Sequence, residues 1–523
     1  MKPDQLRQNP TEIELKLALV ASDTRSLAKQ LAGCSPLQAV KPARQSLHSV
    51  YFDTPDQILQ QMCVALRIRR VGKIAKAARI QTLKTSCQND SALSSRGEWE
   101  AKIPGDTLSL SALQNTAWPE IDRDGSLFAA LAPSFATSFA RTSWTVTAQD
   151  GSVIEVAFDL GEVQASGQSS VICELELELL SGEPASLFAV AQQLAERVAV
   201  IPLSQSKAAR GYALAQGRSD QPQYAQAARL KPGCSMHQVT QQVLREMFSQ
   251  FTANLDTLRR SDDPEVVHQA RVGWRRFKSA LRLFKPVIGN ALPSTMPLKP
   301  LHQALGELRD LEVAVIDTLP SLADAYTDSD PQRSLAWQAL IDALKAGACT
   351  RRTRAREAMR EPAAGACLLA ITRFIEELAL KGATDATQHH AAGRPTPSVR
   401  QWAKHRFNRF RRQLKSALAD ASQPDNQHRA RILAKRLRYA SESLHVFLPK
   451  HRCNRWLAKA SELQTRFGQS RDIRQALALS IQYQGAQGVI EFLRGYVLGR
   501  GKPGFNTPLT KWTFEWAASW SNL

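Results

Sequence analysis

The sequence predicts an α+β protein of two domains, an N-terminal antiparallel β-barrel with a charged interior and a C-terminal all-α pair of helical bundles related by a pseudo-twofold repeat. Three observations lead to this prediction. In Thr11–Leu17 and in Cys173–Leu179, charged and apolar residues alternate with period two, which in a strand places all the charges on one face. From Met236 onward, long segments rich in Leu, Ala and Arg replace this alternation, and one basic motif recurs in them.

The length and the charge distribution support the division. A chain of 523 residues is too long for one ordinary domain. Residues 1–215 carry 21 Lys and Arg against 22 Asp and Glu, whereas residues 216–523 carry 47 against 26, so the net charge of +20 lies in the second part. A strongly basic domain needs an anionic partner, such as nucleic acid, an anionic membrane or polyphosphate. We predict a barrel domain over residues 8–215, a linker over 216–232 and a helical domain over 233–523, with repeats at about 233–385 and 398–523.

Membrane and secretory classes receive no support from the sequence. There is no run of about eighteen apolar residues that would predict a membrane span, and Met1–Gln5 lacks the apolar core of a signal peptide. The eight cysteines form neither a Cys-x-x-Cys pair nor a cluster with zinc spacing. We therefore expect a cytoplasmic protein with free thiols and no membrane partner.

The two alternating strands bring several carboxylates onto their charged faces, together with Lys16. These carboxylates are Glu12, Glu14, Glu174, Glu176 and Glu178. Like charges on neighbouring positions repel one another unless a cation neutralises them, and hard divalent cations prefer oxygen ligands. For either strand taken alone, a solvated sheet edge is the alternative interpretation.

Further alternating segments lie between these two strands. After a short helix over Asp23–Cys34, the predicted strands are Ser49–Thr54, Val64–Arg70, Ile80–Lys84, Arg96–Lys102, Ser138–Thr147 and Val153–Leu160. Both signs of charge recur on one face of several strands, and the opposite face is apolar. Many such strands separated by turn residues favour an antiparallel sheet closed into a barrel. The apolar outer face must then be covered by helices, by the second domain or by another subunit.

A lumen of this composition has a clear chemical use. Its carboxylates would hold Mg²⁺ or Mn²⁺, and its arginines and lysines would hold phosphate oxygens. A metal ion together with Arg and Lys side chains is typical of enzymes that catalyse phosphoryl transfer, because that reaction depends on positioning the phosphate groups and neutralising their charge.

Six motifs follow one another across roughly residues 8–215. They are Glu12-x-Glu14-x-Lys16, Tyr51-Phe52-Asp53-Thr54, Leu66-Arg67-Ile68-Arg69, Glu98-x-Glu100, Glu174-x-Glu176-x-Glu178 and Ser206-Lys207-Ala208-x-Arg210-Gly211. In this order they resemble the CYTH family, also called the triphosphate tunnel metalloenzymes. The resemblance implies an eight-stranded antiparallel tunnel that binds a triphosphate and a divalent metal, Mg²⁺ with Mn²⁺ as the alternative.

The resemblance also implies roles for individual residues. The catalytic residues would be Glu12, Glu14 and Lys16. The metal ligands would be Glu12, Glu14, Glu174, Glu176 and Glu178, and which two of the three late glutamates bind the metal stays open, because all three share a face. The phosphate contacts would be Lys16, Arg67, Arg69, Lys84, Arg141, Lys207 and Arg210. Further lumen residues would be Glu98, Glu100 and Asp159.

Members of this family include inorganic triphosphatases, thiamine triphosphatases and one class of adenylyl cyclases. The leading hypothesis is a metal-dependent inorganic triphosphatase that hydrolyses tripolyphosphate to pyrophosphate and phosphate. The alternatives are adenylyl cyclase or thiamine triphosphatase activity in the same tunnel, and a non-enzymatic polyphosphate-binding protein with a degenerate tunnel. The full set of lumen carboxylates argues against degeneracy.

The helical half contains its basic motif twice. His268 and Arg271 precede Arg275, Arg276, Lys278 and Arg282, and 160 residues later His428 and Arg431 precede Lys435, Arg436 and Arg438. Downstream lie the partner motifs Leu305-Gly306-x-x-Arg309-Asp310 and Phe467-Gly468-x-x-Arg471-Asp472. Helical spacing collects the basic residues into one stripe per copy. Like charges on one face destabilise a helix unless an anion lies alongside; a solvated basic face is the alternative.

This half, over about residues 230–500, resembles the CHAD domain. The resemblance implies two bundles that form a basic groove for long-chain polyphosphate. The binding residues would be His268, Arg271, Arg275, Arg276, Lys278, Arg282, His428, Arg431, Lys435, Arg436 and Arg438. Nucleic acid is disfavoured as a partner, because no base-reading motif or aromatic platform follows the stripes. Asp310 and Asp472 are expected to hold arginines across the interface, and Trp512, Trp516 and Trp520 to form a packing stripe.

Overall fold

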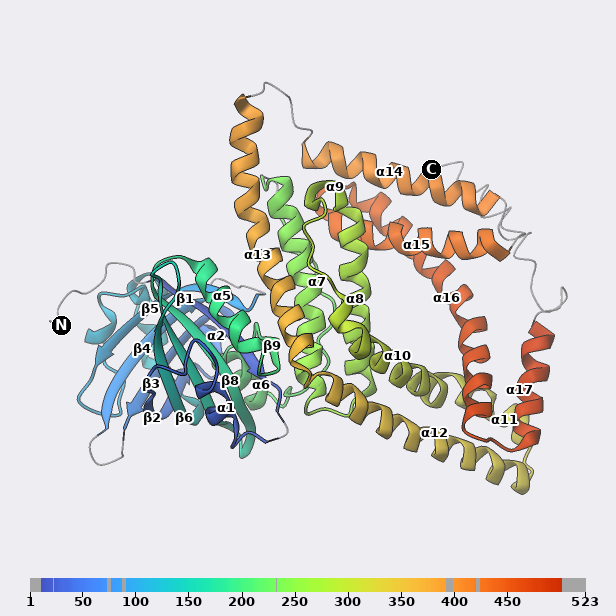
Figure 1. The fold of residues 1–523 in the computed structure, drawn as a ribbon, viewed down its shortest axis with the longest axis horizontal. Coiled ribbons are helices and arrows are strands. Elements are labelled where there is room, and N and C mark those ends of the chain that lie inside the picture. Colours follow the sequence, from blue (N-terminus) through green and yellow to red (C-terminus); the bar gives the residue numbers. More distant parts are fainter. Residues whose placement is uncertain are drawn as a thin grey trace.

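A computed structural model of the chain describes residues 11–21, 23–72, 77–86, 91–231, 233–391, 398–419 and 424–500. A β-barrel lies beside a larger helical domain (Figure 1). Within the described residues, no helix is long and apolar enough to cross a membrane. The predicted tryptophan stripe at Trp512, Trp516 and Trp520 lies outside them.

Eight antiparallel strands form the barrel, as predicted. Their sheet order is β5-β4-β3-β2-β6-β7-β8-β1, and pairing between β1 and β5 closes it. A short ninth strand, which the sequence did not predict, pairs with the far end of β1. The strands are Thr11–Leu19 (β1), Ala43–Asp53 (β2), Val64–Val71 (β3), Ala78–Ser86 (β4), Leu93–Lys102 (β5), Ala132–Thr147 (β6), Val153–Ala165 (β7), Gln168–Ser181 (β8) and Val200–Pro202 (β9).

Helices cover the apolar outer face of the barrel. Leu15 and Leu17 of β1 pack in one core with Leu187 and Leu194 of α5, and Leu369 of the helical domain joins that core. Both a local helix and the second domain therefore cover this face, because burying leucine side chains removes apolar surface from water. The helices of this domain are Leu27–Ala32 (α1), Ile58–Gln61 (α2), Trp118–Ile121 (α3), Ser126–Ala129 (α4), Pro184–Ala195 (α5) and Lys207–Ala215 (α6).

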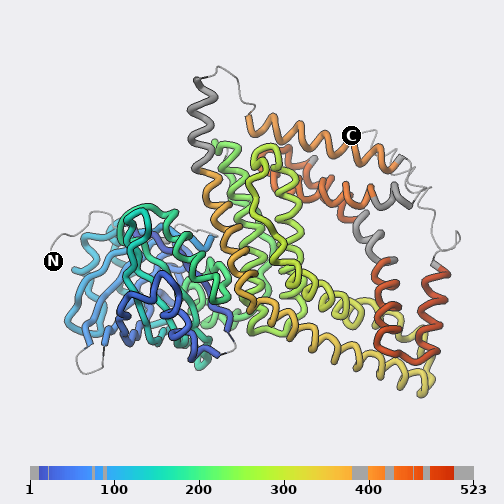
Figure 2. The backbone as a smooth tube through the Cα atoms, viewed as in Figure 1, coloured from blue at the N-terminus to red at the C-terminus, as the bar shows by residue number. Residues whose placement is uncertain are grey.

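The helical domain is built from two halves. In Figure 2 the backbone runs from green in the first half to orange and red in the second, and the barrel lies beside the first half. The helices are Met236–Leu258 (α7), Pro264–Leu283 (α8), Lys285–Ile288 (α9), Lys299–Val313 (α10), Ala323–Thr327 (α11), Pro331–Ala358 (α12), Pro362–Ala391 (α13), Val399–Ala419 (α14), Pro424–Leu444 (α15), Lys450–Gln482 (α16) and Gln487–Arg500 (α17).

The repeat seen in the sequence is also present in the helix packing. Helix α8 packs on α7, helix α15 packs on α14, and α8 and α15 contact each other between the halves. Pro264 begins α8 and Pro424 begins α15, so the offset of 160 residues between the basic motifs extends to the starts of their helices. Proline suits this first helical position because its missing N–H has no partner there in any helix.

The two domains are joined by close contacts. At Gly365 of α13 an added Cβ would lie 2.7 Å from the backbone N and O of Val200, so only glycine lets the helix reach β9 this closely. Arg259 of α7 donates from Nη2 to the carbonyl of Leu19 at 2.8 Å. Glu376 of α13 accepts from Ser91 Oγ at 2.6 Å, next to the start of β5. The helical domain thus touches both strands that close the barrel.

The predicted linker has no helix or strand over residues 216–231, but it is held against the helices. Gln223 N donates to Asn254 Oδ1 at 3.0 Å, and Gln226 N donates to Glu246 Oε1 at 2.9 Å. Leu230 is buried in the core of the helical domain. Pairing of these backbone groups explains how a segment without apolar periodicity is fixed.

Candidate active site

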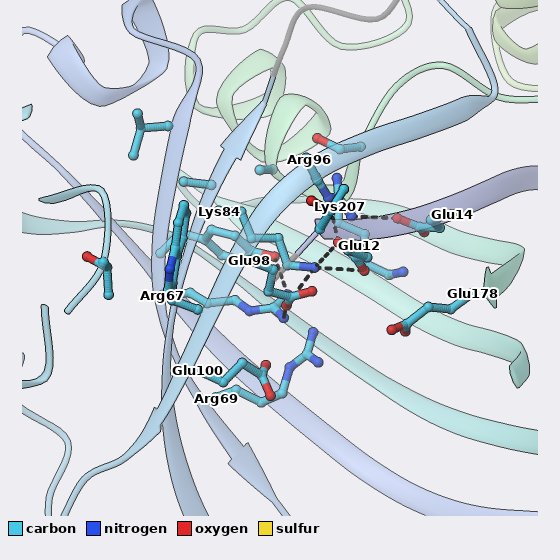
Figure 3. Close-up of a pocket in the computed structure, with 18 of the residues that line it drawn as sticks. Glu12, Glu14, Arg67, Arg69, Lys84, Arg96, Glu98, Glu100, Glu178 and Lys207 are labelled. Atoms are coloured by element: carbon cyan, nitrogen blue, oxygen red, sulfur yellow. Dashed lines mark hydrogen bonds and ion pairs between the residues drawn. The ribbon is translucent and has the colours of Figure 1, made fainter. Parts of the chain in front are cut away.

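The sheet register places the charged face of each strand inside the barrel, as predicted. The interior is a cavity of about 1940 Å³ lined by acidic and basic side chains from β1, β3, β4, β5, β6, β7, β8 and α6. Figure 3 shows these side chains pointing toward one another across the lumen. The outward residues of the same strands are the leucines and valines of the outer core, so strand alternation alone separates the two environments.

Near α6, the lumen holds a cluster of paired charges. Lys207 Nζ lies 2.6 Å from Asp159 and from Glu174, and 2.7 Å from Glu176. Arg141 binds Asp159 through two hydrogen bonds of 2.7–2.8 Å, and Arg210 pairs with Glu174. Burial opposes charge on Glu176, but Lys207, Lys16 and Arg141 outweigh it and hold the pKa of Glu176 well below its usual range. Glu176 is therefore ionised, and lysine and arginine side chains pair with all three carboxylates of this cluster.

A second cluster lies toward the start of β1. Lys84 Nζ lies 3.0 Å from Glu12 and 2.8 Å from Glu98. Arg96 Nε donates to Glu12 at 2.7 Å, and Arg96 also pairs with Glu14. Burial raises the pKa of Glu12, but the cations Lys84 and Arg96 have the larger combined effect and lower it. Arg67 joins this cluster, with Nη2 3.8 Å from Glu98.

Between these clusters, three carboxylates lie side by side on adjacent strands. Glu14 of β1 pairs with Glu178 of β8, and Glu178 pairs in turn with Glu155 of β7. Directly opposed residues have Cβ atoms about 5 Å apart. Burial, followed by the charges of Glu12 and Glu98, raises the pKa of Glu178 to about 7. Burial and Glu176 also raise the pKa of Glu14. Arg96 and Lys16 pair with Glu14, whereas no cation among the described residues pairs with Glu178 or Glu155.

Two groups of carboxylates are candidates for a metal ion, and in the described part of the chain only the first brings three oxygens close together. Among the described residues, Asp159, Glu174 and Glu176 bring one oxygen each within 4.8 Å of one another. Lysine and arginine already occupy that group. Glu14 Oε1 is buried without a hydrogen-bond partner in the described part of the chain, with Lys16 Nζ 3.4 Å away. Glu178 points into the same space without a dashed contact in Figure 3. Because no described cation pairs with Glu178 or Glu155, their hard oxygen donors are open to a divalent ion, and we favour the row of Glu14, Glu178 and Glu155.

The opposite wall is cationic. Arg67 Nη1 donates to Tyr51 OH at 3.2 Å, and Arg69 Nε donates to Ser49 Oγ at 3.2 Å. Burial and the neighbouring charge of Arg67 lower the pKa of Arg69 to about 10. Tyr51 is buried, which raises its pKa, but Arg67 and Arg69 outweigh burial and lower it. Positive charge is therefore concentrated on this wall, and an anion there would be stabilised.

The structure brings most of the predicted tunnel residues to the lumen, and it adds others. The predicted residues that line the cavity are Glu12, Glu14, Lys16, Arg67, Arg69, Lys84, Arg141, Glu176, Glu178 and Lys207. Glu174 lies behind them and pairs with Lys207, and Arg210 pairs with Glu174. The additions are Arg96, Glu155 and Tyr51. Strand parity could have identified Arg96, because it shares a face with Glu98 and Glu100 in β5.

The two basic stripes of the helical domain converge, as the repeat suggested. Burial, then Arg431 of the same helix and Arg275 of α8, lower the pKa of Lys435 to about 8. Arg271 of α8 and Arg471 of α16 both act on the carboxylate of Asp310, whose pKa burial raises. Charges from both halves therefore lie close enough to act on one another.

Three predicted groove residues stand in other surroundings. Arg276 is buried, with Nη2 3.1 Å from Glu246 and Nη1 donating to Gln250 at 2.6 Å. It is therefore a structural ion-pair partner between α7 and α8, because its position on the helix faces the bundle core. Arg436 faces α14 rather than the groove. Arg438 donates to Glu442 at 2.9 Å, which neutralises part of its charge.

The remaining predicted groove residues lie where the stripes place them, with one exception. His268 is half-buried on α8, and burial followed by Arg309 lowers its pKa. Arg275 and Lys278 are exposed on the same helix, and Arg282, also exposed, lines a cavity with Arg406 and Arg436. His428 belongs to α15, but its side chain falls outside the described residues.

Comparisons with known proteins match both parts of the chain. Residues 10–212 match the family model described as CYTH domain, and residues 242–479 match the one described as CHAD domain. Over 203 residues the chain is 34% identical to an inorganic triphosphatase from Haemophilus influenzae. That match covers 39% of this chain and 54% of the relative, so the chain spans about half the length of this curated relative.

Two solved structures are also similar to parts of the chain. The CHAD domain from the plant Ricinus communis is 24% identical with a TM-score of 0.46, covering 56% of this chain and 94% of that one. A putative adenylyl cyclase from Hippeastrum, described as having a dominant triphosphatase activity, is 19% identical with a TM-score of 0.29, covering 39% of this chain and 95% of that one.

Proposed function

Because residues 10–212 of this chain form a CYTH domain and residues 242–479 form a CHAD domain, we propose that it is a metal-dependent inorganic triphosphatase whose helical domain binds polyphosphate. One observation carries the first part. A row of three carboxylates, Glu14, Glu178 and Glu155, lies in the same closed tunnel as a wall that carries arginines, and in the described part of the chain no cation pairs with Glu178 or Glu155. Triphosphate bound with a divalent ion needs both.

Different tunnel residues would bind the phosphate groups and the metal ion. Arg67 and Arg69 would bind phosphate oxygens on the cationic wall, and Lys84 and Arg96 would exchange part of their pairing with Glu12 for the substrate. Glu14 and Glu178 would hold the metal, with Mg²⁺ favoured over Mn²⁺. A divalent ion supplies charge neutralisation and a lowered pKa for a bound water. Because the site is walled by strands on every side, the substrate would be held in one orientation.

The activity is tested by phosphate release from tripolyphosphate, ATP and thiamine triphosphate, each with Mg²⁺, with Mn²⁺ and with a chelator. We expect tripolyphosphate to be the preferred substrate and the chelator to abolish turnover. Glu14→Gln should abolish hydrolysis while the protein stays folded, because the amide keeps the shape of the side chain but not its charge. Formation of cyclic AMP from ATP would favour the adenylyl cyclase alternative, and binding without turnover would favour the non-enzymatic one.

The second part of the proposal rests on the converging stripes. Arg271 and Arg275 of one half face Arg431, Lys435 and Arg471 of the other, and the charges of these groups already disturb one another. A linear polyanion lying in this groove would relieve that repulsion. Polyphosphate binding by the helical domain is tested by titrating the full chain with long-chain polyphosphate, with Glu14→Gln present to prevent hydrolysis in the tunnel. Absence of saturable binding would contradict the polyphosphate part of the proposal and leave the triphosphatase part untouched.

A further inference from the structure

The pseudo-twofold repeat of the helical domain allows one half to be compared with the other, position by position. In the first half, Arg276 of α8 pairs with Glu246 of α7 at 3.1 Å, and its Nε lies 3.6 Å from Glu442 of α15. Gln250 and the carbonyl of Gln226 complete its hydrogen bonds. This buried guanidinium is thus neutralised by carboxylates from both halves, as a buried charge requires.

The equivalent positions in the second half carry the opposite charge. With the offset of 160 residues, Arg276 corresponds to Arg436, Glu246 to Arg406, and Arg282 of the first half to Glu442 of the second. Arg436 of α15 therefore lies beside Arg406 of α14 and Arg282 of α8. The equivalent neighbours of Arg276 in the first half are two glutamates. The structure supports this correspondence, because Arg282, Arg406 and Arg436 line one cavity.

That cavity has the properties of an anion site. Its volume is about 220 Å³, and Arg409 joins the other three arginines among its lining residues, with no carboxylate among them. Since a water molecule takes up about 30 Å³, the cavity has room for a phosphate group with several waters. A second cavity of about 240 Å³ adjoins it, shares Arg436 and adds Arg429.

The arginines of this cavity have unused hydrogen-bonding capacity. In the described part of the chain, the buried Nε atoms of Arg406 and Arg436 have no hydrogen-bond partner. Arg406 stacks its guanidinium 5.8 Å from the ring centroid of Phe410, which fixes its plane. Planar guanidinium groups bind phosphate oxygens through paired hydrogen bonds, and four of them around one space repel one another unless an anion is bound.

We propose that the cavity between α8, α14 and α15 is a binding site for a compact phosphate group, separate from the polyphosphate groove. Its ligand would be free phosphate or pyrophosphate, or the terminal phosphate of a polyphosphate chain, since these share the same dense charge and small size. The site does not depend on the tunnel, because no tunnel residue lines it. It would be present even if the tunnel had no activity.

The first half of the domain itself suggests the test variant. Arg406→Glu copies the arrangement of Glu246 with Arg276, so it should pair with Arg436 and leave the protein folded. The matched control is Arg412→Glu, an exposed residue of the same helix that lines neither cavity and changes the net charge equally. Calorimetric titration of both full-length variants with phosphate and with pyrophosphate, in the Glu14→Gln background without metal, measures the site.

We expect Arg406→Glu to weaken phosphate and pyrophosphate binding by about tenfold or more, and Arg412→Glu to leave it within about twofold of the parent. Equal weakening by both variants would overturn the proposal in favour of a general charge effect, and so would unchanged binding in Arg406→Glu. Absence of saturable binding by the parent would overturn it as well. Polyphosphates of short and long chain, compared at equal concentration of chain ends, identify which ligand the site binds. If Arg406→Glu loses affinity equally for both chain lengths, the ligand is the terminal phosphate of the chain. If it loses affinity only for the free ions, the ligand is phosphate or pyrophosphate.

Discussion

Glu14 of β1 and Glu178 of β8 are direct partners in the sheet, and both carboxylates point into the lumen. The pKa of Glu14 is raised by burial and by Glu176, and that of Glu178 is raised to about 7 by burial and by Glu12 and Glu98. Elsewhere in the lumen, Glu12 and Glu176 have lysine or arginine partners at 2.5–3.1 Å. Arg96 also pairs with Glu14, so Glu178 is the member of this pair for which the described residues supply no cation, and it marks the place where a further cation is required.

We predict that Glu178→Gln lowers kcat/KM for tripolyphosphate by at least about a hundredfold, because a metal ion contributes several kcal/mol of charge stabilisation. The control is Glu162→Gln, which changes a carboxylate on the opposite face of β7 and should have activity close to that of the parent. Metal titration followed by the thermal midpoint should show reduced stabilisation by Mg²⁺ in Glu178→Gln only. Equal metal stabilisation in parent and variant would exclude Glu178 as a ligand.

Arg69 provides a test of the cationic wall. Burial and Arg67 lower its pKa to about 10, and its Nε donates to Ser49 Oγ. The charge of Arg69 therefore destabilises the folded protein when no ligand is bound. We predict that Arg69→Met raises the melting temperature of the free protein and reduces the further rise caused by tripolyphosphate. The control is Arg70→Met on the outer face of the same strand, whose partner Asp106 is exposed. A parental ligand-induced shift in Arg69→Met would contradict phosphate binding by this side chain.

Lys435 gives the groove a defined pH dependence. Its pKa is lowered to about 8 by burial and by Arg431 and Arg275. Between pH 8 and its ordinary value near 10.4, the unfolded chain binds more protons than the folded protein, so the contribution of Lys435 to stability rises with pH across that window. Bound polyphosphate favours the charged form, so binding at pH 8.5 should take up a proton.

We therefore predict that affinity for polyphosphate falls as the pH rises above 8, and that Lys435→Arg removes most of this fall because arginine stays charged. The measurement is calorimetry in buffers that differ in ionisation enthalpy. Lys404→Arg, at an exposed position of α14, serves as the control and should retain the parental fall. An affinity independent of pH from 7 to 10 in the parent would show that Lys435 does not contact the ligand.

The dependence of polyphosphate affinity on ionic strength tests the basic residues of the groove together. Because each phosphate neutralised by Lys or Arg releases condensed counterions, binding of polyphosphate to the full chain should weaken steeply with ionic strength, as it does for nucleic acids. Replacing Arg271, Arg275, Arg431 and Lys435 together by Ala should flatten the slope of log K against log salt. An unchanged slope would indicate that the stripes are solvated surface.

The contact between the domains can be tested at Glu376. This carboxylate accepts from Ser91 Oγ beside β5 and pairs with Arg245 of α7. Glu376→Gln should destabilise the protein by about 1.5–3 kcal/mol, because it weakens hydrogen bonds to a charged group. Glu377→Gln, which removes an exposed pair with Arg373, should change stability by less than about 0.5 kcal/mol. Chemical denaturation of both variants, monitored by circular dichroism, decides between them.

The sequence alone determined which residues face the lumen. Alternation in β1 and β8 put Glu12, Glu14 and Lys16 on one face and Glu174, Glu176 and Glu178 on another, and strand geometry leaves no other arrangement once the leucines are buried. The same holds for the basic stripes, since helical periodicity fixes the side on which Arg271 and Arg275 lie. These are local properties, and a local pattern in the sequence is enough to predict them.

Only the tertiary structure decided which charged side chains lie next to one another and form ion pairs. Whether a lumen carboxylate is neutralised depends on which strand lies beside it. The sequence could therefore not show that Lys207 pairs with Glu174 and Glu176, while no cation of the described segments forms an ion pair with Glu178. In the helical domain, Arg276 and Arg436 occupy equivalent positions in nearly identical motifs. The first is buried against Glu246, and the second faces Arg406 across a cavity. The free energy of a charge depends on its neighbours through space, and packing between helices and strands chooses those neighbours.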